Sequence, residues 1–105
     1  MNGPTPTKAD LRRFDQLQAV GCIAHRLDGK PGVPSQIHHI KQGNHQKTLP
    51  LCEWHHVGQQ LDGMSQRAML DLFGPSLAKQ KKAFVARYGT EFDLLEKVNL
   101  LIDEL

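Results

Sequence analysis

The sequence predicts an α+β, mostly helical fold, in which a short β-hairpin and a helix form a metal-binding core with flanking helices. Two features predict it. Five of the six histidines and one of the two cysteines lie within residues 34–56, which also carry strand and turn signals. The segments on either side show helical apolar spacing between glycine-containing breaks. Because a chain of 105 residues has only a modest hydrophobic core, a structural metal would help to stabilise it.

The composition is that of a globular protein, with 39% apolar and 23% charged residues. Residues 1–6 are expected to form a flexible N-terminal tail, and residues 7–105 a single domain. No apolar run approaches the roughly 18 residues of a membrane span, and the N-terminus lacks the basic and apolar regions of a secretory signal. We therefore expect a cytoplasmic protein with no membrane partner.

Four helices are predicted outside the histidine-rich segment. Thr7 and Asp10 form a capping pattern for the first helix, which ends at Gly21. Ser65 caps "QRAMLDLF", and the segment "SLAKQKKAFVARY" ends before a glycine. Thr90 and Asp93 form a capping pattern that begins the last helix. The apolar face of that last helix consists of Leu94, Leu95, Val98, Leu101, Ile102 and Leu105. Residues 22–36 are rich in glycine and proline and are expected to be a loop.

The histidine-rich segment predicts a two-stranded ribbon followed by a helix. "SQIHHI" and "KTLPL" are short and partly β-branched, and Gly43-Asn44 between them supplies turn chemistry. Pro50 indicates that the second strand is short. Residues 51–62 show no β-alternation and precede a glycine, so we expect a helix there with Gly58 in its interior.

Two pairs of ligand-type residues predict a structural zinc ion. Cys22-Ile-Ala-His25 and Cys52-Glu-Trp-His55 repeat one pattern, with 26 residues between the pairs. Thiolates and imidazoles are the ligands of closed tetrahedral zinc sites, and a reducing compartment disfavours a disulfide. Two alternatives stay open. The cysteines could be small buried hydrophobic residues, or Cys52 could pair with His56, four residues away, instead of His55.

A second set of histidines lies close to the first in sequence. His38 and His39 lie on the predicted ribbon, and His56 is turned about 100° from His55 on the predicted helix. This pattern resembles the ββα-metal core of the HNH nucleases. The resemblance implies phosphodiester hydrolysis with His39 as general base and with His38 and His56 holding a catalytic Mg or Mn ion. Because neighbouring strand residues point to opposite faces, the ribbon would have to twist or end at this doublet.

Two residues of the turn have alternative interpretations. His45 is a third ligand of the catalytic ion, a residue that orients a phosphate, or a solvated loop residue. Asn44 is the polar middle residue of an HNH motif or simply a residue that favours the turn.

The resemblance extends to one family. "CIAH", "IHHI", "LPLCEWHH", "FGPSLAKQKKAF" and "YGTEFDLLEKVN" follow the order of the phage recombination-enhancement, RecA-dependent nucleases, over roughly residues 21–102. This implies a metal-dependent DNA endonuclease of phage or prophage origin, acting with RecA filaments in the bacterial host cytoplasm. His25 stands where the family more usually has cysteine, and Val57 where it has arginine.

The charge distribution is compatible with a nucleic-acid partner. Residues 1–89 carry 12 Lys and Arg against 6 Asp and Glu, a net charge of +6, whereas residues 90–105 carry one Lys against 5 acids. The candidates for contacting DNA phosphates are Lys41, Lys79, Lys81, Lys82 and Arg87. The alternative for the last four is a solvated helix face.

Other functions remain open at this point. The first alternative is a non-cleaving, zinc-stabilised module that binds DNA or RecA filaments, and another is an inhibitor that acts by protein contacts. Trp54 would stack on a base in a DNA-binding site or pack in the core. The complete set of His38, His39 and His56 favours an enzyme, because a binding module needs no imidazole base.

Overall fold

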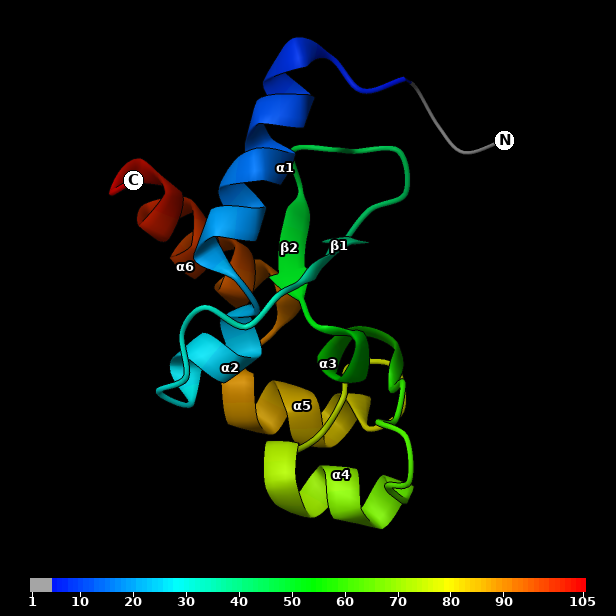
Figure 1. Cartoon of the computed structure of the whole chain (residues 1–105). Helices are drawn as coiled ribbons and strands as arrows, with labels where there is room; N and C mark the ends of the chain where they lie inside the picture. The colour runs from blue at the N-terminus through cyan, green and yellow to red at the C-terminus, as the bar shows by residue number, and fades with distance from the viewer. Residues whose placement is uncertain (1–4) are drawn as a thin grey trace.

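The computed structural model describes residues 5–105, so most of the predicted N-terminal tail lies outside the described residues. The elements, in chain order, are α1 (Lys8–Val20), α2 (Ile23–Leu27), β1 (Gln36–His39), β2 (Thr48–Leu51), α3 (Glu53–Val57), α4 (Gln66–Phe73), α5 (Lys81–Tyr88) and α6 (Glu91–Asp103). Figure 1 shows the hairpin beside α1 and α6, with α3, α4 and α5 grouped at its other end. The predicted α+β, mostly helical fold with a hairpin and a following helix is confirmed. Within the described residues, no helix is long and apolar enough to cross a membrane.

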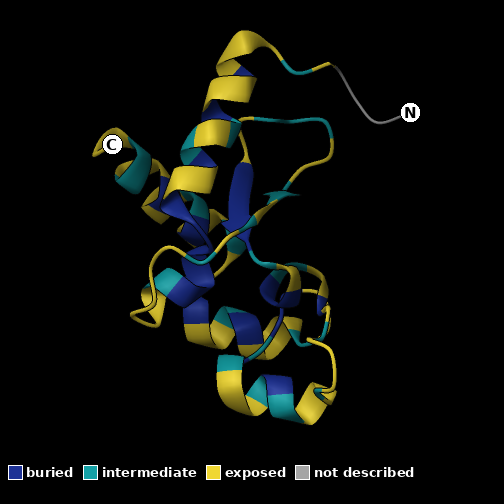
Figure 2. Ribbon diagram, in the orientation of Figure 1, coloured by how far each residue is buried: buried dark blue, intermediate teal, exposed yellow. Residues whose placement is uncertain are grey.

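Strand β2 is the centre of the core. All four of its residues are buried, and it contacts α1, α2, α3 and α6 as well as β1. It pairs antiparallel with β1, with Gln36 opposite Leu51 and His39 opposite Thr48. Figure 2 shows β2 in the colour of buried residues and β1 mostly in the intermediate colour. The two histidines of β1 therefore lie on the less buried strand, which pairs along its length with the buried strand β2.

The helices around β2 bury the residues that their spacing predicts. Leu17 of α1, Phe84 of α5, and Leu94 and Val98 of α6 are fully buried in one cluster with β2. The capping boxes predicted at the starts of α1 and α6 are present, so both helices have defined first turns. Leu105, predicted on the apolar face of the last helix, lies beyond the end of α6 and is 67% exposed.

A buried arginine connects α1, β2 and α6. The Arg13 Nε and Nη2 atoms donate to the side chain and carbonyl of Thr48, at 2.9 and 2.8 Å, and Nη1 donates to Asn99 Oδ1 at 2.8 Å. Burial lowers the pKa of Arg13. Because these partners are neutral, hydrogen bonds rather than an ion pair compensate its desolvation.

Two segments differ from their predicted structure. The expected loop 22–36 begins with the single-turn helix α2, whose Ile23 and Ala24 are fully buried. The expected helix 51–62 is only α3, because Gly58 adopts left-handed backbone angles (φ +75°, ψ +27°) and ends it. A Cβ at Gly58 would also lie 2.7 Å from Lys79 Cδ. In addition, residues 77–79 form a turn before α5.

The central position of β2 predicts that its side chains dominate stability. Leu49→Ala, at a fully buried position, is expected to lower the free energy of unfolding by about 2–5 kcal/mol. Leu100 of α6 is 60% exposed, so Leu100→Ala should change the free energy of unfolding by less than about 0.5 kcal/mol. Urea unfolding of the two variants measures the difference, and equal effects would contradict a core centred on β2.

Candidate metal centres

The cysteine and histidine of each pair occupy the same positions at the start of a short helix. Cys22 is the N-cap of α2, with His25 in its first turn, and Cys52 is the N-cap of α3, with His55 in its first turn. The Cys52 sulfur also accepts a hydrogen bond from the His55 backbone N–H at 3.4 Å. In each pair the start of a short helix therefore brings a thiol and an imidazole to one side.

The two pairs meet at one point. One ligand atom from each of Cys22, His25, Cys52 and His55 lies within 4.8 Å of every other. Three sulfur–nitrogen separations within the cluster are 3.3, 3.6 and 3.7 Å. A tetrahedral zinc ion with ordinary bond lengths requires ligand separations of roughly 3.5 Å. The donor set and its spacing thus fit a structural metal ion, as the sequence predicted.

The surroundings of His55 prepare it as a ligand. The ring is fully buried, and its Nε2 atom lies 2.8 Å from the carbonyl oxygen of Phe73. Because a carbonyl oxygen only accepts, Nε2 carries the proton. The other ring nitrogen, Nδ1, is the one that faces the sulfurs of Cys22 and Cys52. A metal ligand whose second nitrogen is held in this way has a fixed tautomer and orientation.

The two thiols are unequal without a metal ion. Interaction with Cys22 lowers the pKa of Cys52 to about 4, with burial acting against the shift and the contact with His55 adding to it. The pKa of Cys22 is raised by the same interaction and by burial. Of the two sulfurs, Cys52 therefore loses its proton more readily. A metal ion that binds both sulfurs would displace the proton of Cys22 as well.

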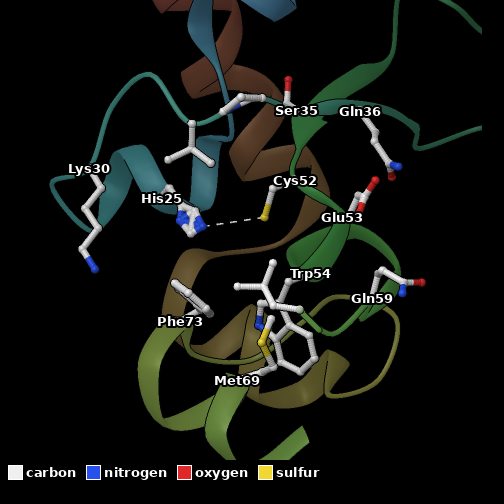
Figure 3. Close-up of a pocket in the computed structure, with 13 residues that line it drawn as sticks. His25, Lys30, Ser35, Gln36, Cys52, Glu53, Trp54, Gln59, Met69 and Phe73 are labelled. Carbon is white, nitrogen blue, oxygen red and sulfur yellow. Dashed lines mark hydrogen bonds between the residues drawn. The ribbon is translucent and has the colours of Figure 1, made fainter. Parts of the chain in front are cut away.

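An apolar pocket of about 470 Å³ lies next to this cluster. Figure 3 shows His25 and Cys52 on one side of it and Trp54, Met69 and Phe73 on another. Trp54 is only 3% exposed, and its indole N–H donates to the Gly74 carbonyl at 2.8 Å. Trp54 therefore packs in the core and is not exposed to stack on a base.

His56 belongs to a different group of side chains. Its ring centroid lies 5.0 Å from that of His38, and its Nδ1 atom lies 3.0 Å from Gln36 Oε1. His38 in turn contacts Glu91 of α6, with 2.7 Å between Nε2 and Oε2. The geometry therefore supports the pairing of Cys52 with His55, since His56 is turned toward β1. Burial, followed by the charge of His38, lowers the pKa of His56.

His39 lies with a third group. Its Nε2 atom is 3.0 Å from His45 Nδ1, and both rings pack edge-on against Phe14 of α1. This arrangement follows from the alternation of side chains along β1, which sends His38 and His39 to opposite faces. The structure thus brings together His38 and His56, and separately His39 and His45. Burial, followed by the charge of His45, lowers the pKa of His39.

The predicted DNA-contacting residues have different neighbours. Lys81 Nζ lies 4.0 Å from Glu91 Oε1, close to the His38 group, whereas Arg87 forms a 3.1 Å ion pair with Asp28. Lys79 packs its aliphatic chain against Gly58. Lys82 is exposed, and Lys41 lies in the hairpin loop. Among these candidates, Lys81 brings positive charge next to the paired histidines.

Sequence reasoning missed Glu91 and Gln36. Glu91 lies in the first turn of a well-capped helix, where acidic residues are common because they complement the helix dipole. No local pattern connects it with His38, which is 53 residues away in sequence. Gln36 precedes the histidine doublet and gives no signal beyond its polarity.

The hairpin, α3 and the cluster of cysteines and histidines define a small protein with a core like that of the ββα-metal proteins. Residues 6–102 match the family described as recombination enhancement, RecA-dependent nuclease. The match covers nearly the whole chain, and the chain belongs to this family, as the motifs predicted. Membership indicates a nuclease involved in recombination enhancement, for which DNA is the expected substrate.

The cluster predicts a difference between adjacent histidines. His55→Ala is expected to abolish stoichiometric zinc binding and to lower the melting temperature, because it removes one of four ligands. His56→Ala should retain the zinc, because its ring is directed toward Gln36 and His38. Elemental analysis and thermal unfolding of the two purified variants measure this. Loss of zinc from the His56 variant alone would reverse the assignment.

Proposed function

We propose that the protein is a metal-dependent DNA endonuclease of phage or prophage origin that acts with RecA filaments during recombination in the bacterial host cytoplasm. Residues 7–105 would act as one zinc-stabilised, HNH-like nuclease domain. The observation that carries the proposal is the meeting of His38 from β1 and His56 from α3, 5.0 Å apart between ring centroids, in a chain of the RecA-dependent nuclease family.

The paired histidines provide the ligands that such chemistry needs. His38 of β1 and His56 of α3 lie with their rings 5.0 Å apart between centroids, and the His38 side chain is 18% exposed. A Mg or Mn ion bound there would act as a Lewis acid toward a phosphate oxygen and the leaving oxygen. The chain's own contribution is to hold the two rings in place and to position the phosphodiester beside them.

His39 is proposed as the general base. Its lowered pKa keeps the imidazole neutral near pH 7, so that it can accept a proton from the attacking water. His45, 3.0 Å from its Nε2 atom, is proposed to orient this ring rather than to serve as a third ligand of the catalytic ion. Lys81, and further from the site Lys41, Lys79, Lys82 and Arg87, are proposed to contact DNA phosphates.

One observation favours a second candidate function. His38 and His39 contact different groups on opposite faces of β1, so the proposed base is not directed to the paired histidines in this conformation. A chain in which this separation persists on DNA would bind an ion without activating water. The second candidate is therefore a non-cleaving, zinc-stabilised module that binds DNA or RecA filaments.

Cleavage assays test the nuclease. Wild-type protein with Mg or Mn is expected to cleave a plasmid paired with a RecA filament, and His39→Ala should reduce the rate by about 100-fold or more, the usual contribution of a general base. Parallel assays on the bare plasmid measure the requirement for RecA. The rate should also fall as the pH drops through the pKa of His39, because the protonated imidazole cannot accept a proton.

Arg12→Ala is the control substitution outside the proposed site, since Arg12 is an exposed residue of α1. It should cleave at the wild-type rate, and zinc content and melting temperature confirm that each variant is folded. Absence of cleavage by wild-type protein on both substrates would contradict the nuclease and favour the binding module.

The position of Lys81 predicts its effect on DNA affinity. Lys81→Ala should weaken duplex binding and reduce the slope of log K against log salt by about 0.9, the value for one lost phosphate contact. Lys97→Ala removes the same charge from an exposed position of α6 and should leave the slope unchanged. Fluorescence anisotropy over a series of salt concentrations, without added divalent ions, gives both slopes. Equal slopes for the two variants would exclude a specific role for Lys81.

A further inference from the structure

We propose that Glu91 is the positioning residue for His38, and that it fixes which nitrogen of this ring is offered to a divalent ion. The inference rests on the proposed function, because it assigns a role in the same site. Glu91 Oε2 lies 2.7 Å from His38 Nε2. An ionised carboxylate only accepts hydrogen bonds, so Nε2 carries the proton and Nδ1 keeps the lone pair that can bind an ion.

The partner histidine is held in a corresponding way. The Nδ1 atom of His56 lies 3.0 Å from the amide oxygen of Gln36. Because that oxygen accepts, Nδ1 carries the proton and Nε2 keeps its lone pair. Both rings therefore have one nitrogen occupied by an acceptor and one available, the state that two ligands of a single ion require.

The cluster of cysteines and histidines shows the same device in this chain. There the Phe73 carbonyl occupies Nε2 of His55, while Nδ1 faces the two sulfurs. At a site whose donor geometry fits zinc, an acceptor thus binds the ring nitrogen that does not face the metal position. Glu91 does the same for His38 and Gln36 for His56, whose ring centroids lie 5.0 Å apart.

The position of Glu91 makes it a rigid support. It lies in the first turn of α6, next to the Thr90 capping box, and the same helix buries Leu94 and Val98 in the core. Lys81 lies 4.0 Å from the other carboxylate oxygen, Oε1. Oε2 therefore remains for His38, and α6 becomes the third element, after β1 and α3, that shapes the site.

A purely structural ion pair would have different consequences. The His38 and Glu91 side chains are 18% and 21% exposed, so the pair is largely shielded from solvent and removal of one partner is expected to lower stability. The melting temperature measures that loss, whereas the tautomer of the His38 ring measures positioning. This separation allows positioning to be measured without reference to cleavage.

The experiment measures Mn²⁺ binding to the zinc-loaded full chain by calorimetry and by electron paramagnetic resonance. Glu91→Ala is expected to weaken the binding that depends on His38 by about 10–100-fold, the usual effect of removing the partner of a metal ligand. Glu91→Gln should lose less Mn²⁺ affinity, because its amide oxygen can still accept the hydrogen bond from His38. Glu96→Gln, which makes the same charge change at an exposed position of α6, should bind as wild type does, and His38→Ala defines complete loss.

Nitrogen-15 NMR of the histidine rings gives a second readout that needs no divalent ion. In the wild type under mildly alkaline conditions, His38 should be the Nε2–H tautomer, and Glu91→Ala should convert it to a mixture. Wild-type affinity and an unchanged tautomer in Glu91→Ala would overturn the proposal, as would a wild type whose Mn²⁺ binding does not depend on His38.

Failure of the proposed function gives a different result. Wild-type protein that binds Mn²⁺ through His38 and Glu91 but does not cleave DNA would support the inference and contradict the nuclease. Cleavage and Mn²⁺ affinity that both survive Glu91→Ala, but not His38→Ala, would support the nuclease and contradict the role of Glu91.

Discussion

The convergence of two cysteine-histidine pairs on one point is the constraint on which the site depends. One pair comes from the start of α2 and the other from the junction of β2 and α3, and their ligand atoms lie within 4.8 Å of one another. Helices of five residues are too short to be stable alone. Burial against β2, together with the shared cluster, holds them. A metal ion at this point would therefore fix both helices relative to the central strand.

The cluster also constrains His56, because His56 directly follows the cluster residue His55 in α3. His55 is fully buried and held from behind by the Phe73 carbonyl, while His56 faces β1 about 100° around the same helical turn. The cluster thereby sets the direction of His56. Arg13 holds β2 between α1 and α6, and the capped start of α6 sets the direction of Glu91. Three elements that are distant in sequence are thus brought to one edge of the hairpin.

The histidine doublet of β1 faces two environments because a strand alternates its side chains. His38 joins a polar group with Glu91 and His56, whereas His39 lies with His45 and Phe14. The proposed nuclease therefore requires a substrate or an ion to draw both imidazoles toward one phosphate. Lys81 Nζ lies 4.0 Å from Glu91 Oε1 and brings positive charge to this edge.

The sequence alone determined the elements with strong local signals, namely the capped helices α1 and α6, the hairpin around Gly43-Asn44, and the two ligand pairs. Their patterns are local, since caps, turns and ligand spacings are set within a few residues. Only the tertiary structure decided the rest. Helix α2 forms because its apolar residues are buried, Gly58 ends α3 where Lys79 packs against it, and Glu91 meets His38 from 53 residues away. Contacts at that separation depend on how the helices pack around β2, which no short stretch of sequence specifies.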